Sequence, residues 1–238
     1  MCGGAARDIL LSRGRIIPRD LDIVFRYVSL EDICSVFHDY LDKMTRFGGL
    51  SLKAKDWTIH MWPLSETWAF KQKHIEGKGL SDFVKTTFLD IEAIAVQLFS
   101  RKKQKREIYS KGFFEAIIKK TIEINLEDNP YPAVCIVRSL AVANRFKFAI
   151  GPRLAKYIVH YSSQTEPEEL VKIYRDRYQI GWISPEELDS YIRIIREQLR
   201  VSDKQPVSLF GWETESCVLT RPRRNEYRRD NQYRFAFE

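Results

Sequence analysis

Two segments in the first half of the chain have hydrophobic patterns typical of β-strands. Polar and apolar residues alternate over Asp20–Val24, and branched and aromatic residues continue this run to Val28. Residues 57–62 alternate in the same way, with His60 at the centre of the polar face. Because alternate residues of a strand point to the same side, each segment is predicted to be a strand with one apolar face.

Helical spacing of apolar residues predicts two helices beside these strands. The first covers residues 30–44, preceded by Ser29 as a capping residue with Asp32 at the capping-box position. A shorter helix is predicted over residues 66–75. Strands and helices therefore mix in the first half of the chain.

The second half shows helical spacing almost throughout. Pro130 and Pro132 interrupt the chain before the longest of these segments, and Ser184 with Glu187 forms another predicted capping box. The predicted helices cover residues 113–122, 134–148, 154–159, 168–178 and 185–199. The pattern thus predicts a mixed first half and a helical second half.

Composition limits the classes of protein that are compatible with this pattern. Hydrophobic residues make up 44% of the 238 residues, enough for a sizeable core, and the net charge is +7. This charge fits a polyanionic partner such as RNA, and it also fits an ordinary basic protein. Apolar runs fall short of the ~20 residues of a membrane span, so no membrane partner is expected. The four cysteines are widely spaced, which argues against a zinc site and favours a reducing, cytoplasmic location.

Positive charge is concentrated in two segments. Residues 101–106 carry five cations in six residues, and the end of the chain interleaves arginines with aromatic residues. Such segments contact RNA by charge and stacking, but a solvated hairpin tip and a basic tail explain them equally simply. The candidate RNA contacts are Arg101, Lys102, Lys103, Arg228 and Arg229.

The richest chemistry lies between Gly3 and Asp22. The pair Gly3 and Gly4 precedes a turn of helix, and glycines at a helix start let backbone N–H groups approach a phosphate. Asp20 and Asp22 share one face of the predicted strand, so a cation between them is favoured. Two carboxylates plus substrate phosphates are the usual ligands of Mg²⁺. Together the two parts indicate phosphoryl or nucleotidyl transfer.

This combination resembles the head domain of the class II nucleotidyltransferases, which include tRNA CCA-adding enzymes and bacterial poly(A) polymerases. Their pattern is Gly-Gly-x-x-Arg-Asp-x-Leu-Leu, a basic loop and Asp-x-Asp. The matching residues here are Gly3, Gly4, Arg7, Asp8, Leu10, Leu11, Asp20 and Asp22. A second match is the family's arginine-bearing helix, on which Arg138 aligns, although Cys135 and Ala141 replace two of its arginines.

The resemblance implies an α+β fold, a polymerase-beta-like palm with a small mixed sheet followed by an all-helical neck. The expected divisions are a head over residues 1–125, a neck over 126–200 and a basic extension over 201–238. A short form lacking the family's body and tail domains is expected from the length. Only two residues precede Gly3, where the family has a buried strand, so we expect that strand to be missing or replaced.

The function implied is metal-dependent addition of nucleotides from NTP to an RNA 3′ end, of the tRNA or poly(A) type. Asp20 and Asp22 are the expected catalytic residues and ligands of Mg²⁺ or Mn²⁺. The NTP is expected to contact Gly3, Gly4, Arg7, Asp8 and Arg138. Two alternatives stay open: transfer to a protein or tRNA acceptor in a toxin or defence role, and a catalytically silent relative that binds nucleotide or RNA.

The identity of a third metal ligand is also open. Asp56 and His60 belong to the second predicted strand and its approach. Asp90 and Glu92 lie where the family has an Arg-Asp-Phe-Thr-Ile-Asn segment, with Glu92 at the asparagine position, and they would share one face of a strand. Either could substitute for the family's aspartate, or face solvent.

Overall fold

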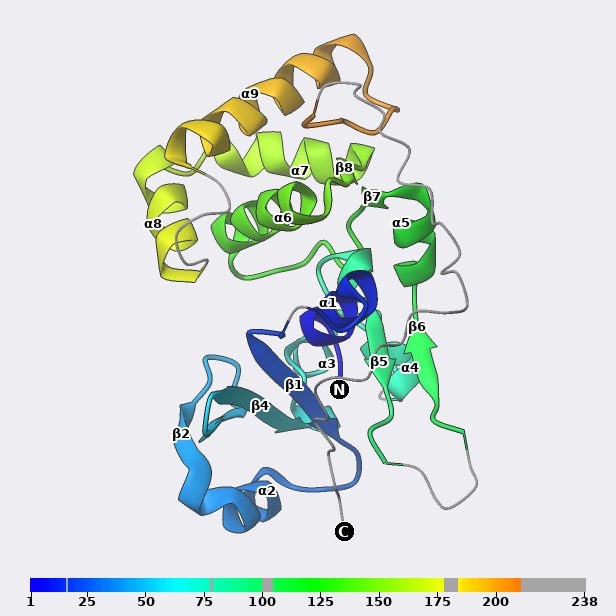
Figure 1. The fold of residues 1–238 in the computed structure, drawn as a ribbon, viewed down its shortest axis with the longest axis vertical. Coiled ribbons are helices and arrows are strands. Elements are labelled where there is room, and N and C mark those ends of the chain that lie inside the picture. The colour runs from blue at the N-terminus through cyan, green and yellow to red at the C-terminus, as the bar shows by residue number, and fades with distance from the viewer. Residues whose placement is uncertain (16, 78, 100–104, 178–183, 211–238) are drawn as a thin grey trace, which may run out of the picture.

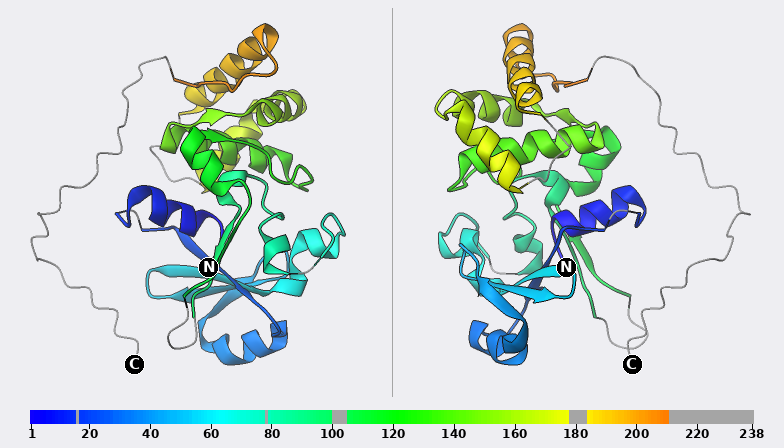
Figure 2. Two further views of the ribbon diagram at one scale, coloured as in Figure 1. Left: turned by 90° about the vertical axis from the view of Figure 1, so that its right-hand side faces the viewer. Right: turned by 60° about the vertical axis from the view of Figure 1, so that its left-hand side comes forward.

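The computed structural model describes residues 1–15, 17–77, 79–99, 105–177 and 184–210. A small β-sheet forms one end of the molecule and a group of helices forms the other (Figure 1). Helix α1 (Gly4–Ser12) lies between them, and the two turned views show the same order (Figure 2). Strands mixed with helices, followed by helices, confirm the expected α+β class.

The central sheet has four strands in the order β1-β4-β3-β2. Strands β1 and β4 are parallel, and the other neighbours are antiparallel, so the sheet is mixed as expected. The register places Asp22 beside His60, and His60 beside Ser51. The strands span Asp20–Phe25 (β1), Leu41–Met44 (β2), Leu50–Ala54 (β3) and Trp57–Pro63 (β4).

One face of this sheet is covered and the other carries polar side chains. Ile33 of α2 (Leu30–Phe37) packs with Leu50, Leu52 and Met61 in a buried cluster. Because successive side chains of a strand alternate, the residues between these apolar positions point to the opposite face. Asp22, Ser51 and His60 therefore form a row on the opposite face, next to Trp62, which packs against Phe83 there.

The predicted helix over residues 30–44 is correct at its start and wrong at its end. The Ser29–Asp32 capping box is present, but α2 ends at Phe37, a 3-10 turn (η1) covers His38–Tyr40, and the last four residues form β2. The spacing of apolar residues there is compatible with either structure. Pairing with β3, a strand that the pattern did not predict, decides for strand.

A β-hairpin extends the sheet on the side of β1. Its strands are β5 (Ile94–Val96) and β6 (Ile108–Ser110). Cys2 pairs antiparallel with both Asp22 and Ala95, so it lies between β1 and β5 where the family's first strand was expected. The prediction that Asp90 and Glu92 share one face of a strand is wrong, because these residues form a 3-10 turn, η3 (Asp90–Glu92).

The helical end of the molecule packs around one large apolar core. Ile136, Leu140, Ile158 and Ile195 are fully buried in it. Each predicted helix of the second half has a counterpart, and both ends of α9 are close to those predicted. The helix predicted over residues 113–122 is wrong at its end, because Thr121 and Ile122 form a strand. The observed helices are α5 (Phe113–Lys119), α6 (Pro132–Phe146), α7 (Pro152–Ser162), α8 (Pro167–Arg177) and α9 (Pro185–Val201).

Short elements connect the two ends. They are η2 (Leu64–Glu66), α3 (Trp68–Lys71), α4 (Leu80–Phe83), and the parallel pair β7 (Thr121–Ile122) and β8 (Ala149–Ile150). The large helical core also contains Phe88, Leu89 and Ile91 from the first half of the chain. The sheet end and the helical end thus pack together through η3. Among the described residues, no helix is long and apolar enough to cross a membrane.

Candidate functional site

The two aspartates of the Asp-x-Asp pattern lie on β1, as predicted. Their side chains are partly exposed, at 21% for Asp20 and 29% for Asp22. His60, on the neighbouring strand β4, places its Nδ1 atom 3.2 Å from Oδ1 of Asp22. This hydrogen bond is the main cause that raises the pKa of His60. Parallel pairing of β1 with β4 therefore gives Asp22 a histidine neighbour that the sequence had placed on the correct face.

The start of helix α1 lies directly beside Asp22. Gly3 caps this helix with a φ of 64°, a conformation that favours glycine. A Cβ atom on Gly3 would lie 3.6 Å from Oδ2 of Asp22. Backbone N–H groups in the first turn of a helix lack intrahelical partners and attract anions. The predicted phosphate cradle and one predicted metal ligand are thus adjacent.

A cavity of about 870 Å³ connects these groups with the helical end. Gly3, Asp22 and His60 line its sheet side, and Glu92 and Arg138 line it from η3 and α6. Asp176 and Arg177, at the end of α8, also line it. A cavity of this size accommodates a nucleotide-sized ligand.

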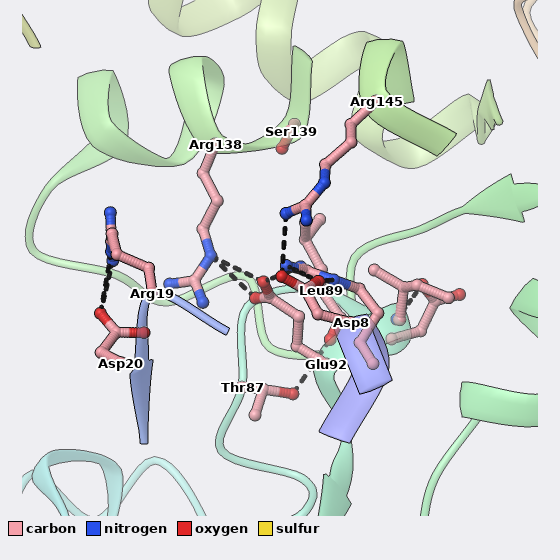
Figure 3. A network of polar contacts seen from close by, with 12 residues as sticks. Asp8, Arg19, Asp20, Thr87, Leu89, Glu92, Arg138, Ser139 and Arg145 are labelled. Carbon is pink, nitrogen blue, oxygen red and sulfur yellow. Dashed lines mark hydrogen bonds and ion pairs between the residues drawn. The ribbon is translucent and has the colours of Figure 1, made fainter. Parts of the chain in front are cut away.

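Asp20 lies outside the lining of this cavity, and its carboxylate pairs with Arg19. The Nη2 and Nε atoms of Arg19 lie 2.6 and 3.0 Å from Oδ2 of Asp20 (Figure 3). Nη1 of Arg19 also donates to the backbone carbonyl of Arg177 at the end of α8, at 2.9 Å. Arg19 therefore places a positive charge beside Asp20 and links the start of β1 to the end of α8.

A buried ion-pair network lies above the sheet, between α1, η3 and α6. Nη1 of Arg7 lies 2.6 Å from Glu92, and its Nε and Nη2 both lie 2.8 Å from Oδ1 of Asp8. Arg138 and Arg145 extend from α6 toward Glu92 and Asp8 respectively, each at 2.8 Å (Figure 3). The two carboxylates are only 3% and 8% exposed, so the acids of the network are buried although Arg138 reaches the cavity.

This network changes the picture of the predicted nucleotide contacts. The side chain of Arg7 is 8% exposed and its guanidinium donates to Asp8 and Glu92. Arg138 is 41% exposed and lines the cavity. Three guanidinium groups face two carboxylates in this network, and Arg138 is the most exposed of the three. The contacts of Arg7, Asp8, Gly4 and Arg138 with NTP stay predictions.

Sequence reasoning missed the role of Glu92 as the acid that joins α1 to α6. The signal was present, since Glu92 stands where the related family has a neutral asparagine, and an acid there requires a cationic partner if buried. Asp90 faces away from this network: its Oδ1 accepts from the backbone N–H groups of Ile91 and Glu123. Burial raises the pKa of Asp90 to about 7.

A third carboxylate for the metal is not found in the described residues. These contain no cluster of three or more His, Cys, Asp or Glu side chains able to hold a metal ion. Asp56 lies in the turn between β3 and β4, two residues before Thr58, the residue that pairs with Asp20. Two carboxylates with substrate oxygens still fit Mg²⁺, which is commonly held in this way.

The predicted RNA contacts cannot be placed. Arg101, Lys102, Lys103, Arg228 and Arg229 all lie outside the described residues. The flanking strands β5 and β6 form the antiparallel hairpin on whose tip the first three were expected.

Comparison with protein-family models and with curated proteins finds no match. Among solved structures, the chain is similar to a structure of a tRNA-processing enzyme complex, with a TM-score of 0.58 and 18% identity over 83% of this chain and 53% of that one. It is also similar to a CCA-adding enzyme with ATP, with a TM-score of 0.51 and 19% identity over 84% and 52%.

The chain spans about half the length of these two structures. A third, a tRNA-processing enzyme in an apo form, matches with a TM-score of 0.51 and 16% identity over 86% of this chain and 61% of that one. At such low identity the likeness concerns the fold. The described chain therefore has the nucleotidyltransferase fold of these tRNA-processing enzymes, as its sequence motifs indicated.

Proposed function

We propose that this protein is a metal-dependent nucleotidyltransferase that transfers a nucleotide from NTP to an RNA 3′ end. The observation that carries the proposal is the close approach of Gly3 at the start of α1 to Asp22 on β1, where even a Cβ atom on Gly3 would lie 3.6 Å from the carboxylate, at the wall of one cavity. An anion-binding helix start and a metal-binding carboxylate must be adjacent if a triphosphate is to bridge them.

Cations and backbone donors of the chain hold the triphosphate. The first turn of α1 supplies N–H groups beside Gly3 and Gly4, and Arg138 supplies charge from α6. Glu92 holds Arg138 by its Nε atom. Arg7 holds Glu92 and Asp8 in place by hydrogen bonds. It therefore affects nucleotide binding indirectly, by positioning Glu92, which in turn holds Arg138.

Asp20 and Asp22 are the proposed metal ligands and catalytic residues. A bound Mg²⁺ or Mn²⁺ would activate the attacking hydroxyl and stabilise the leaving pyrophosphate. His60 orients Asp22 through its hydrogen bond. Arg19 lies 2.6 Å from Oδ2 of Asp20, so it competes with a bound cation for that oxygen.

The acceptor class comes from the structural neighbours, which are described as tRNA-processing and CCA-adding enzymes, one of them with ATP. An RNA 3′ end, of the tRNA type, is accordingly the proposed partner. The division into head (1–125), neck (126–200) and extension (201–238) and a cytoplasmic location are parts of this same proposal.

Incubation with each labelled NTP, Mg²⁺ and total RNA tests the proposal. We expect label to enter RNA at the 3′ end, and Asp22→Asn to lower the rate at least about 100-fold, the scale of losing one main electrostatic contact to the transition state. Asp56→Asn is the matched control, because it changes the same residue type in the turn that precedes β4, outside the cavity lining.

Three outcomes are informative. Full activity of Asp22→Asn would contradict the assigned site. Label entering protein instead of RNA would replace the proposed acceptor and keep the enzyme. No transfer from any NTP, with NTP still bound, would identify a silent relative.

A further inference from the structure

Three aromatic side chains from separate elements meet at the edge of the same cavity. Phe47 is on the turn between β2 and β3, Trp68 begins α3, and Tyr131 precedes α6. The Phe47 ring lies 6.2 Å from that of Trp68 and 5.9 Å from that of Tyr131, centroid to centroid. All three line the cavity, and we call them the aromatic platform.

Two rings of the platform are exposed and the third, that of Trp68, is partly buried. Phe47 is 46% exposed and Tyr131 is 37% exposed. Aromatic rings grouped at an accessible cavity wall present π-faces and edges that a planar ligand can cover. The platform is thus available for stacking.

The chain holds Phe47 and Tyr131 in place by local hydrogen bonds. In the turn that carries Phe47, the amide of Thr45 donates to the carbonyl of Gly49 at 2.7 Å, and the Thr45 hydroxyl accepts from the amide of Gly49 at 2.9 Å. Gly48 has a φ of 84°, which favours glycine. The amide of Tyr131 donates to the Asn129 side chain at 2.9 Å. A preformed platform loses less conformational entropy on binding.

Trp68 is also fixed. Its ring stacks on His74 with centroids 4.8 Å apart, and His74 lies 3.3 Å from Asp128. The stack on His74 therefore orients the Trp68 ring.

Positive charge accompanies the rings. The guanidinium of Arg46 lies 5.8 Å from the centre of the Tyr131 ring, and Lys43 lines the same part of the cavity. Two acids lie near the platform: Glu66, which pairs with Lys71 at 2.8 Å, and Asp128, which lies 3.3 Å from His74. Aromatic faces combined with cations are the features that bind single-stranded nucleic acid, by base stacking and phosphate contact.

The strand register places the platform beyond the proposed catalytic carboxylates. Ser51 pairs with His60, which pairs with Asp22, while the turn at residues 45–49 follows Met44 and precedes Leu50. Two strand spacings of about 4.8 Å separate Asp22 from Ser51, and Phe47 is four residues along the chain from Ser51. The platform is thus set apart from the Asp22 carboxylate, and the test below distinguishes a base of the acceptor strand there from the base of the NTP.

We propose that the aromatic platform binds an unpaired base of the acceptor RNA, close behind its reacting 3′ end. This inference rests on the proposed function and adds the substrate feature that the enzyme selects, an unpaired 3′ segment.

Binding of a short single-stranded RNA, measured by anisotropy without NTP or metal, tests the inference. We expect Phe47→Ala to weaken binding about tenfold, the effect of losing one stacked base. Phe47→Trp should restore it, because it keeps an aromatic face. Phe114→Ala on α5 is the matched control: Phe114 is 45% exposed, close to Phe47, and lies outside the cavity lining.

A second arm tests whether the base itself is recognised. An otherwise identical RNA that is abasic behind its 3′-terminal nucleotide should bind wild type and Phe47→Ala equally. Equal binding of intact RNA by Phe47→Ala and wild type would overturn the inference, as would a loss of NTP affinity instead of RNA affinity. Neither result touches the proposed function, which is tested by transfer with Asp22→Asn.

Discussion

Two pairs of acidic residues, close in space, have opposite surroundings. Asp20 and Asp22 on β1 are 21% and 29% exposed, and each is joined to a partner that is itself exposed, Arg19 at 63% or His60 at 30%. Asp8 and Glu92 are 8% and 3% exposed and are held among three guanidinium groups.

The difference separates acids that can bind a cation from acids that hold the fold. A partly exposed ion pair exchanges its partner at little cost, since water screens the pair. A buried acid cannot change its partner without leaving an uncompensated charge in a low-dielectric interior. The same residue types therefore perform ligand binding on β1 and join α1, η3 and α6 above it.

Removing a buried acid should have the largest effect. Glu92→Ala leaves Arg7 and Arg138 without their shared carboxylate, and we expect a loss of about 3–5 kcal/mol in the free energy of unfolding. Urea denaturation measures it. Asp22→Asn, the corresponding change in the exposed pair, should alter stability by no more than about 0.5 kcal/mol. Equal losses in the two variants would remove the distinction.

Asp90 extends the comparison to a buried acid held by backbone N–H groups rather than by arginines. Its pKa is raised to about 7, so the folded state binds its proton more tightly than the unfolded chain does. Its contribution to stability is full below about pH 4 and is lost as pH rises through 7, by up to about 4 kcal/mol.

Asp90→Asn should remove this decline, because an amide oxygen still accepts both N–H groups and carries no charge. Denaturation of both proteins at pH 5.5 and pH 8.5 provides the measurement. The prediction is wrong if wild type and variant lose the same stability between the two pH values.

Arg138 and Arg145 sharpen the comparison within one helix. Arg138 is 41% exposed at the cavity and Arg145 is 15% exposed beside Asp8. Arg138→Ala should weaken NTP binding by about 1.5–3 kcal/mol, the value of a charged hydrogen bond. Arg145→Ala should mainly lower stability. Calorimetric titration of both variants with NTP measures the two affinities. If Arg145→Ala weakened NTP binding and Arg138→Ala did not, the triphosphate would not lie beside Arg138.

The smallest effect is expected at Arg19. Arg19→Ala removes the cation that competes for Asp20, so the Mg²⁺ concentration for half-maximal transfer should fall roughly two- to fivefold. Arg26→Ala, at the other end of β1, is the control. An unchanged or higher Mg²⁺ requirement would show that Arg19 does not compete with the metal.

The sequence by itself determined the local features of this protein. Gly3 at a helix start, alternation in β1 and β4, and the capping boxes at Ser29 and Ser184 depend on neighbours in the chain. Short-range backbone preferences and side-chain periodicity are sufficient for them. The motif resemblance added the fold, because its residues occur in the expected order.

Tertiary structure decided which of these residues meet. Strand β2 depends on pairing with β3, and Asp22 acquires His60 only through the parallel register of β1 with β4. Glu92 lies 85 residues from Arg7 and 46 from Arg138, and it becomes their common partner through the packing of η3 between α1 and α6. Such contacts depend on free energies of burial and charge pairing summed over distant segments, which no local pattern contains.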